Sequence, residues 1–271
     1  MRIIDMHAHA FPDRIAASAL ATVGGNAGVI AEYDGTIAGL RALIDGAGIT
    51  RSVVQPVASK PSQVRSINDW ATGITDDRIT VFAAMHPDQP DLEAEVTALA
   101  ERGFLGFKLH PEYQAFRPDE ERLDPLYAAA SRHNLIVYFH AGEDIGLPGV
   151  HSTPQIFADV LDRHPNVTLV LAHMGGWRQW DDVRRHLAGR NVYLDTSFTL
   201  PYLGAESFVE LVAAHGADHV VFGSDAPWAN AAAEIGRLRA LPLSDDDLDA
   251  IFWRNAAGLL ERAAGTSSRP R

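Results

Sequence analysis

The sequence predicts an α/β protein built as a (β/α)8 TIM-type barrel, and three observations support this fold class. Short apolar runs rich in Val, Ile, Leu and Phe alternate with longer amphipathic stretches, as in βα units around a parallel sheet. Five of these runs end on a histidine or an aspartate, and such barrels keep their active-site residues at the C-terminal ends of the strands. The chain of 271 residues suits one barrel, so we expect a single domain over residues 1–264.

Eight apolar runs are predicted to form the strands of the barrel. They comprise residues 3–9, 52–56, 80–84, 106–110, 137–140, 169–173, 192–195 and 220–225. Between them, apolar residues recur at three and four positions in residues 91–99, and residues 122–133 form another helical stretch. Residues 12–36, after the first strand, are rich in Gly and Ala, and we expect them to form a loop insertion over the site.

The C-terminal part of the chain is predicted to be helical up to a short tail. Ser244 is suited to cap a helix N-terminus, and the three aspartates after it favour that end of the helix dipole. A final helix is expected after this segment. Residues 265–271 show no periodicity, so we expect this tail to fray.

The composition excludes several classes of partner. The formal net charge of −12 and the lack of a Lys/Arg run oppose binding to nucleic acid or to an anionic membrane, since both are polyanions. No apolar run approaches the ~18 residues of a membrane helix, and the first residues lack an apolar signal segment. The absence of cysteine rules out disulfides and thiolate chemistry. We therefore expect a soluble, cytoplasmic protein whose partner is a small molecule.

The pair His7 and His9 is the first candidate for metal binding. Side chains two residues apart on a strand point the same way and lie about 7 Å apart, so both imidazoles can reach one cation. His140 and Asp225 end later strands at the same edge of the predicted barrel. Each could instead be a buried polar residue held by hydrogen bonds, but four such residues from three strands favour a metal site. Three nitrogens and one carboxylate suit one Zn²⁺ ion per chain, and Mn²⁺ or Fe²⁺ accept the same ligands.

Five sequence motifs, in order along the chain, resemble those of the amidohydrolase superfamily. They are the His7–His9 pair, Gly-Phe-Lys-Leu-His-Pro at 106–111, Phe-His-Ala-Gly at 139–142, Ala-His-Met-Gly-Gly at 172–176 and Gly-Ser-Asp-Ala-Pro-Trp at 223–228. The resemblance covers nearly the whole chain and points to the amidohydrolase-related branch that contains aminocarboxymuconate semialdehyde decarboxylase. It implies a distorted (β/α)8 barrel, and relatives in this branch suggest a homodimer.

The same resemblance assigns roles to residues of the predicted site. It implies a divalent metal held by His7, His9, His140 and Asp225. It also implies that His173 is a catalytic histidine near the metal, which acts as an acid or base or holds the metal-bound water. His173 and Asp225 can each take or return a proton, and the reference pKa of a histidine is about 6.5. Alternatively, His173 is a structural histidine whose replacement would cost stability more than turnover.

Lys108 and His110 share one face of their strand, and each has more than one interpretation. In several binuclear amidohydrolases a lysine at this strand is carboxylated and bridges two metals. Lys108 can also bind a substrate carboxylate or pair with an acid, and His110 can line the pocket as a substrate-binding residue. Arg178 and Trp228 follow their strands on the same side and are further candidates for substrate binding. An arginine among tryptophans, however, is also common as a cation–π packing feature.

Two reaction classes fit the predicted ligands, because a fold does not decide a function. The first is hydrolysis of an amide or lactone by metal-activated water, and the second is non-oxidative decarboxylation of an unsaturated or aromatic acid. We favour a metal-dependent hydrolase, because the chain is shorter than expected for the known decarboxylases and its insertion is not aromatic. A non-catalytic barrel that only binds a ligand is the third hypothesis, and the complete set of ligand-type residues argues against it.

Overall fold

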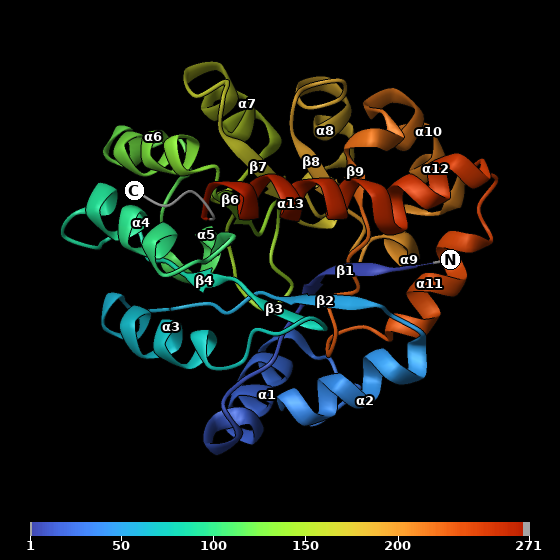
Figure 1. Ribbon diagram of the computed structural model, residues 1–271. Coiled ribbons are helices and arrows are strands. Elements are labelled where there is room, and N and C mark those ends of the chain that lie inside the picture. Colours follow the sequence, from blue (N-terminus) through green and yellow to red (C-terminus); the bar gives the residue numbers. More distant parts are fainter. Residues whose placement is uncertain (1, 268–271) are drawn as a thin grey trace.

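The computed structural model describes residues 2–267, and their strands form a parallel barrel (Figure 1). The strands are β1 (Ile4–Ala8), β2 (Arg51–Val54), β3 (Ile79–Val81), β4 (Ala83–Ala84), β5 (Gly106–Leu109), β6 (Ile136–Phe139), β7 (Thr168–Leu171), β8 (Tyr193–Asp195) and β9 (Val220–Val221). Neighbours in sequence are neighbours in space in both sheets, β1-β2-β3 and β4-β5-β6-β7-β8-β9. Met6 N donates to Phe222 O at 2.8 Å, and Ala8 pairs with Ala226. The last strand therefore returns to the first.

The third predicted strand is divided in two. The sequence predicts one strand over residues 80–84, but β3 ends before Phe82 and β4 begins after it. β3 pairs with β2, while β4 pairs with β5. Phe82 N donates to Val54 O at 3.0 Å, so this residue joins the two sheets. Because β3 and β4 together fill one strand position, the nine short strands form the eight strand positions of a (β/α)8 barrel.

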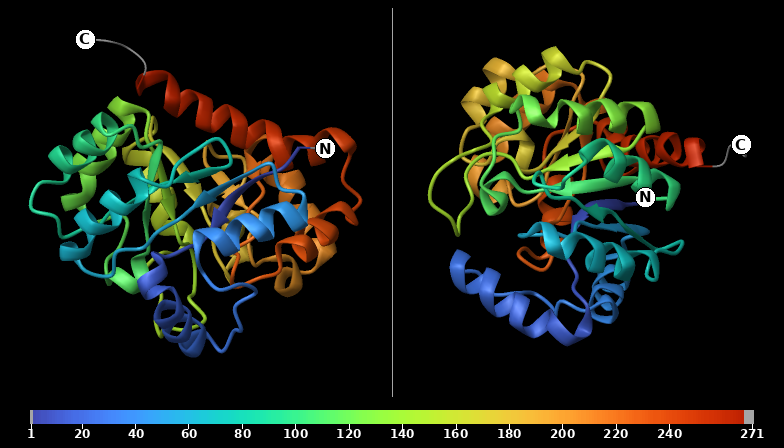
Figure 2. Two further views of the ribbon diagram at one scale, coloured as in Figure 1. Left: turned by 60° about the horizontal axis from the view of Figure 1, so that its bottom comes forward. Right: turned by 90° about the vertical axis from the view of Figure 1, so that its left-hand side faces the viewer.

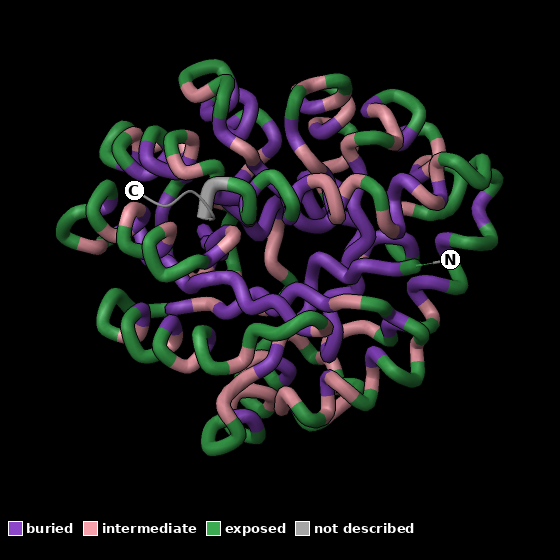
Figure 3. The backbone as a smooth tube through the Cα atoms, viewed as in Figure 1, coloured by how far each residue is buried: buried purple, intermediate pink, exposed green. Residues whose placement is uncertain are grey.

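Helices surround the barrel and connect its strands (Figure 1). They are α1 (Asp13–Ala27), α2 (Ile37–Ala47), α3 (Val64–Thr72), α4 (Leu92–Glu101), α5 (Pro111–Gln114), α6 (Asp124–His133), α7 (Pro154–Arg163), α8 (Trp180–His186), α9 (Leu200–Leu203), α10 (Ala205–His215), α11 (Ala231–Arg239), α12 (Asp245–Asp249) and α13 (Asn255–Ser267). Buried residues concentrate in the strands and on the inner helix faces (Figure 3). Within residues 2–267, no helix is both long and apolar enough to cross a membrane.

The segment after β1 is a helix rather than the expected loop. Most of the predicted insertion, residues 12–36, is occupied by α1. Asp13 lies in the first turn, where an acid favours the positive end of the helix dipole, and Gly28 ends the helix in the left-handed conformation with a φ of 67°. The alanines between them are strong helix formers and outweigh the internal glycines. Figure 2 shows α1 beside the end of the barrel opposite α13.

The C-terminal helices close the end of the barrel at which the strands begin (Figure 2). Ser244 caps α12, because its hydroxyl accepts a hydrogen bond from Asp247 N at 3.1 Å. A π-helical turn, Ala250–Arg254, leads into α13. Leu259 and Leu260 of α13 belong to one apolar cluster with interior side chains of β1, β6 and β7. The opposite end, where the strands finish, carries the pocket.

The predicted C-terminal tail overlaps the last turn of α13. The sequence predicts fraying over residues 265–271, whereas α13 continues to Ser267. Residues 268–271 lie outside the described residues, so fraying there stays a prediction.

Candidate active site

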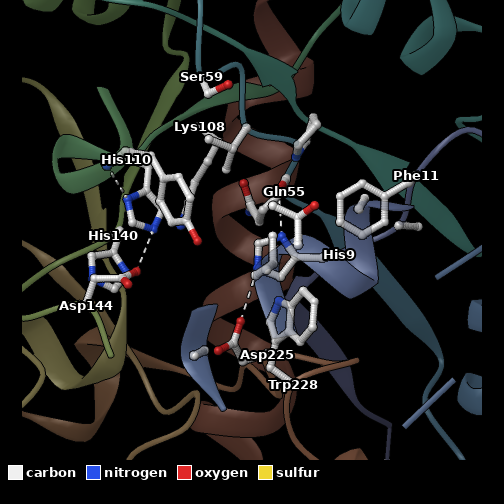
Figure 4. A pocket seen from close by; sticks show the side chains of 18 of the residues that line it. His9, Phe11, Gln55, Ser59, Lys108, His110, His140, Asp144, Asp225 and Trp228 are labelled. Carbon is white, nitrogen blue, oxygen red and sulfur yellow. Dashed lines mark hydrogen bonds and ion pairs between the residues drawn. The ribbon is translucent and has the colours of Figure 1, made fainter. Parts of the chain in front are cut away.

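A pocket of about 800 Å³ opens at the end of the barrel where the strands finish (Figure 4). Its polar lining includes all five histidines of the predicted site together with Lys108 and Asp225. Its apolar lining includes six aromatic side chains, which are Phe11, Trp70, Tyr113, Trp177, Phe198 and Trp228. A mostly apolar pocket with a few convergent polar groups is typical of a site for a small molecule.

Three of the four predicted metal ligands converge in this pocket. His7 Nε2 lies 3.2 Å from His9 Nε2 and 3.4 Å from Asp225 Oδ1, and His9 Nε2 lies 3.1 Å from the same oxygen. β1 carries His7, and Asp225 follows β9 in the left-handed conformation with a φ of 64°. Asp225 N donates to His7 O at 2.7 Å, which holds the two segments together. We refer to His7, His9 and Asp225 as the donor trio.

Hydrogen bonds to His7 and His9 orient the rings of the donor trio so that their free nitrogens can bind a cation. His7 Nδ1 donates to Asp195 Oδ2 at 2.8 Å and His9 Nδ1 donates to Gln55 O at 2.9 Å, so each Nε2 carries a lone pair. Burial lowers the pKa of His7 to about 4, which keeps this imidazole neutral. Two facing lone pairs beside a carboxylate fit a divalent metal ion.

His140, the fourth predicted ligand, lies outside the donor trio (Figure 4). Its Nε2 donates to Glu143 O at 3.1 Å, and its ring stacks on His110 with 4.2 Å between the centroids. Its Nδ1 faces His173 Nε2 at 3.2 Å. The loop carbonyl and the stacked ring hold the imidazole away from the trio. The structure therefore brings together three of the four predicted ligands and places the fourth beside them.

Asp195, at the end of β8, organises the site, although the sequence indicated it only as a strand end. It is fully buried, and its Oδ2 accepts from His7 Nδ1 at 2.8 Å and from the Tyr138 hydroxyl. Its Oδ1 accepts from the backbone N of His173 at 3.0 Å and of Ser197 at 2.8 Å. Burial alone would raise the pKa of Asp195, but His7 holds it well below its usual range. A carboxylate that orients a metal-binding histidine is a common support of metal sites.

His173 lies beside the donor trio and lines the pocket. The centroid of its ring is 5.5 Å from that of His7, and only 5% of the residue is exposed. Its Nδ1 lies 3.0 Å from both the carbonyl and the hydroxyl oxygen of Ser197. One anchored ring nitrogen and one nitrogen turned toward other titratable groups suit a residue that transfers a proton.

Lys108 is a buried cation that faces the same pocket. Among residues 2–267, no hydrogen-bond acceptor reaches its Nζ, and the ammonium lies 4.8 Å from the centroid of the Tyr138 ring. Burial lowers the pKa of Lys108 to about 8, although the carboxylates of Asp195 and Asp225 favour the charged form. A buried ammonium without an acceptor is costly, and a ligand with an anionic oxygen would satisfy it.

Replacing Lys108 by Met should stabilise the metal-free protein most at neutral pH. Because burial weakens proton binding in the folded state, the stability contributed by Lys108 is lowest below pH 8 and rises toward pH 10.5. The fall in pKa from 10.5 to about 8 corresponds to roughly 3 kcal/mol. The variant should gain up to this amount at pH 7 and lose most of the gain by pH 10. Urea unfolding of chelator-treated proteins measures this, and an equal difference at both pH values would contradict it.

The other predicted substrate-binding residues take different positions. His110 and Trp228 line the pocket. Arg178 instead has an exposed side chain, stacks over the Trp177 ring at 4.2 Å from its centroid, and lies 3.7 Å from Glu143 Oε2. A left-handed backbone with a φ of 61° at Arg178 accompanies this outward position. These contacts agree with the alternative interpretation of Arg178 as a cation–π packing residue, and substrate binding by Arg178 stays a prediction.

The sequence did not predict that α1 would supply pocket residues. Arg14, Ser18 and Thr22 recur at intervals of four along this helix, and all three line the pocket. Ile15 and Ala19 follow the same interval and also line it. This spacing was the available signal, and it was missed because the segment was predicted to be a loop.

Solved structures that are similar over most of their length share the barrel. The 5-carboxyvanillate decarboxylase from Sphingomonas paucimobilis has a TM-score of 0.74 at 16% identity, over 96% of this chain and 99% of that chain. The 5-carboxyvanillate decarboxylase from Novosphingobium aromaticivorans, solved with manganese and 4-hydroxy-3-methoxy-5-nitrobenzoic acid, has a TM-score of 0.72 at 17% identity, over 96% of each chain. The 2,6-dihydroxybenzoate decarboxylase from Rhizobium has a TM-score of 0.70 at 17% identity, over 96% of this chain and 98% of that chain. These similarities confirm the predicted fold class.

Sequence comparison identifies the family. The sequence has no match among curated proteins. A family model described as Amidohydrolase, however, matches residues 4–262, which is nearly the whole chain. The chain therefore belongs to the amidohydrolase family of enzymes, as its motifs predicted.

Proposed function

We propose that this protein is a metal-dependent, non-oxidative decarboxylase of a small aromatic or unsaturated carboxylic acid. The observation that carries the proposal is the buried ammonium of Lys108, which lacks a hydrogen-bond acceptor among the described residues and faces the same pocket as the donor trio. This cation offers a binding point for an anionic oxygen of the substrate. The aromatic lining of the pocket suits a flat, apolar ring or chain. The similarity to three decarboxylase structures supports the same reaction class.

Different residues of the site would bind different parts of the substrate. A divalent ion held by His7, His9 and Asp225 would supply Lewis-acid polarisation of a substrate oxygen, and the manganese complex of the Novosphingobium enzyme supports Mn²⁺ beside Zn²⁺ as a candidate. Lys108 would pair with the substrate carboxylate or with a neighbouring oxygen on the ring. Trp228 and the other aromatic residues would orient the ring and exclude water from it.

Proton transfer in this proposal belongs to His173. In the reaction, the bond between the carboxylate carbon and the adjacent carbon breaks, carbon dioxide leaves, and the bonding electron pair stays on the adjacent carbon. His173 then gives a proton to that carbon and regains one from solvent. Ser197 orients the imidazole through Nδ1, and Nε2, which faces His140 Nδ1 at 3.2 Å, is the nitrogen that we assign to the transfer.

Hydrolysis of an amide or lactone is the reaction that the sequence favoured, and its two reasons no longer argue against a decarboxylase. The chain is not too short, because the alignment with the Sphingomonas decarboxylase covers 99% of that chain. The segment at residues 12–36 is itself poor in aromatic residues, but it folds as α1 along a pocket to which other segments supply six aromatic residues. A small-molecule substrate fits either reaction, and the predicted homodimer stays a prediction.

Turnover in D₂O distinguishes the two reactions. The manganese- or zinc-loaded protein should release carbon dioxide from at least one member of a panel of hydroxybenzoic and unsaturated carboxylic acids. The product should carry one deuterium at the carbon that lost the carboxylate, as measured by proton NMR and mass spectrometry. Lactones and amides, tested in parallel, should stay intact. Acid release from a lactone or amide, without carbon dioxide from any acid, would contradict the proposal and support a hydrolase.

A further inference from the structure

A hydrogen-bond acceptor without a donor belongs to the lining of the pocket. Gln55 follows β2, is fully buried and lines the pocket next to His9 (Figure 4). Among residues 2–267, no donor reaches its side-chain oxygen, Oε1. Two other pocket-lining residues of the described chain have a buried side-chain atom without a partner, and both atoms, Lys108 Nζ and Trp177 Nε1, are donors. The pocket therefore offers a ligand one such acceptor together with donors.

Hydrogen bonds fix the direction of the Gln55 amide. Its Nε2 donates to Met6 O at 3.0 Å, and because a backbone carbonyl only accepts, the nitrogen of the amide must face Met6. The backbone N of Gln55 donates to Ala8 O at 2.8 Å, and its backbone O accepts from His9 Nδ1 at 2.9 Å. Exchanging the two amide atoms would therefore leave Met6 O without its donor. Oε1 is the one polar atom of Gln55 that has no partner among the described residues.

The missing donor has consequences for the ligand that fills the pocket. A buried acceptor without a donor costs free energy, and a ligand that supplies the donor recovers that cost. An ionised carboxylate has no proton to donate, so it can pair with Lys108 but cannot satisfy Gln55 Oε1. A ligand that satisfies both residues needs a second polar group that carries a proton. A hydroxyl group is the neutral group of this kind that aromatic and unsaturated acids commonly carry.

We propose that Gln55 is a specificity-determining residue whose Oε1 accepts a hydrogen bond from a hydroxyl group of the substrate. This inference rests on the proposed function, and it narrows the substrate to carboxylic acids that also carry a hydroxyl. Lys108 would bind the carboxylate and Gln55 the hydroxyl. A site built to bind a hydroxyl rejects an analogue that lacks the proton, because the buried acceptor is then left unpaired. A methyl ether of the substrate should therefore bind more weakly than the substrate itself.

Two other accounts of Gln55 make different predictions. In the first, the side chain only completes the hydrogen bonding of Met6 O, at a place where the pairing of β1 with β2 shifts between Asp5 and Ala8. Oε1 then stays hydrated in the complex, and replacing Gln55 leaves the preference for a hydroxyl unchanged. In the second, Lys108 turns and donates to Oε1, so replacing either residue abolishes the same preference.

Ligand binding to the manganese-loaded full chain tests the proposal. Calorimetry gives dissociation constants for ortho-, meta- and para-hydroxybenzoic acid and for their methyl ethers, and for hydroxylated lactones and amides with theirs. The wild type should bind at least one hydroxylated acid about 10-fold more tightly than its ether. Gln55→Met should lose this preference, whereas Gln55→Glu, which keeps an acceptor, should retain it. Gln155→Met is the matched control at an exposed glutamine on α7, and it should match the wild type.

The outcomes separate this inference from its competitors and from the proposed reaction. Equal affinities for every hydroxyl and ether pair in the wild type would overturn it, as would an unchanged preference in Gln55→Met. Lys108→Met should bind all acids more weakly but keep the preference, and loss of the preference there would overturn the inference in favour of a Lys108–Gln55 pair. A preference found only among lactones and amides would keep the role of Gln55 and contradict the decarboxylase.

A second measurement serves if Gln55→Met does not fold. The ¹³C resonance of the Gln55 side-chain carbonyl is followed in the wild type and is assigned by its absence from Gln55→Glu. A hydroxylated acid that donates to Oε1 should shift this resonance, and its methyl ether should not. An equal shift with both ligands would contradict the inference.

Discussion

The Asp225→Asn variant is expected to lose about a thousandfold or more of kcat/KM. Asp225 is the only charged member of the donor trio, and its Oδ1 lies within 3.4 Å of both His7 Nε2 and His9 Nε2. An amide keeps the shape of the side chain but removes the negative charge that holds a divalent ion. A metal ion contributes several kcal/mol to such reactions, and about 4 kcal/mol corresponds to a thousandfold in rate. Carbon dioxide release and bound metal per chain should fall together.

The matched control for this variant is Asp245→Asn. Asp245 is an exposed acid in the first turn of α12, so the chemical change is the same but lies outside the pocket. This control should keep the turnover and the metal content of the wild type. If Asp225→Asn kept its metal and stayed within tenfold of the wild-type rate, the donor trio would not be the metal centre.

The Asp195→Asn variant should have the largest effect on stability together with a loss of metal affinity. Its carboxylate accepts hydrogen bonds from His7, Tyr138, His173 and Ser197, all in a fully buried place. An asparagine has one acceptor oxygen, so its NH₂ group must face donors. Breaking such a buried network costs roughly 3–5 kcal/mol, and losing the carboxylate that orients a ligand histidine costs about 10- to 100-fold in metal affinity.

Urea unfolding of the metal-free protein and Mn²⁺ titration measure the two effects separately. Asp218→Asn is the control, because Asp218 is an exposed acid near the start of β9 whose partner, His219, lies outside the site. The control should change the free energy of unfolding by less than about 0.5 kcal/mol. An Asp195→Asn variant that matched the wild type in both measurements would show that the carboxylate neither supports the core nor orients His7.

The two variants also distinguish a residue that binds the metal ion from a residue that stabilises the folded structure around it. Asp225 faces the cation itself, so its replacement should act mainly on metal content and rate. Asp195 acts through His7, so its replacement should reduce the free energy of unfolding even when no metal is present. If both variants lowered the free energy of unfolding of the metal-free protein equally, Asp225 would support the fold as well as face the cation, and the two roles would not belong to separate residues.

The sequence determined the features that depend on periodicity along one strand. Alternation and strand length placed His7, His9 and Asp225 at the ends of β1 and β9, and closure of a parallel barrel brings those ends together. The burial of Lys108 in the pocket follows from the same strand pattern. The family assignment was available for the same reason, because the motifs lie at the strand ends.

Tertiary structure alone decided the features that depend on neighbours distant in the sequence. The partner of His7 Nδ1 is Asp195, 188 residues away, and no local pattern pairs them. The direction of the His140 ring depends on a carbonyl in its own loop and on the His110 ring from another strand. The position of Arg178 depends on stacking with Trp177. Strand ends follow from backbone periodicity, whereas side-chain directions follow from packing and hydrogen bonds that exist only once the barrel has closed.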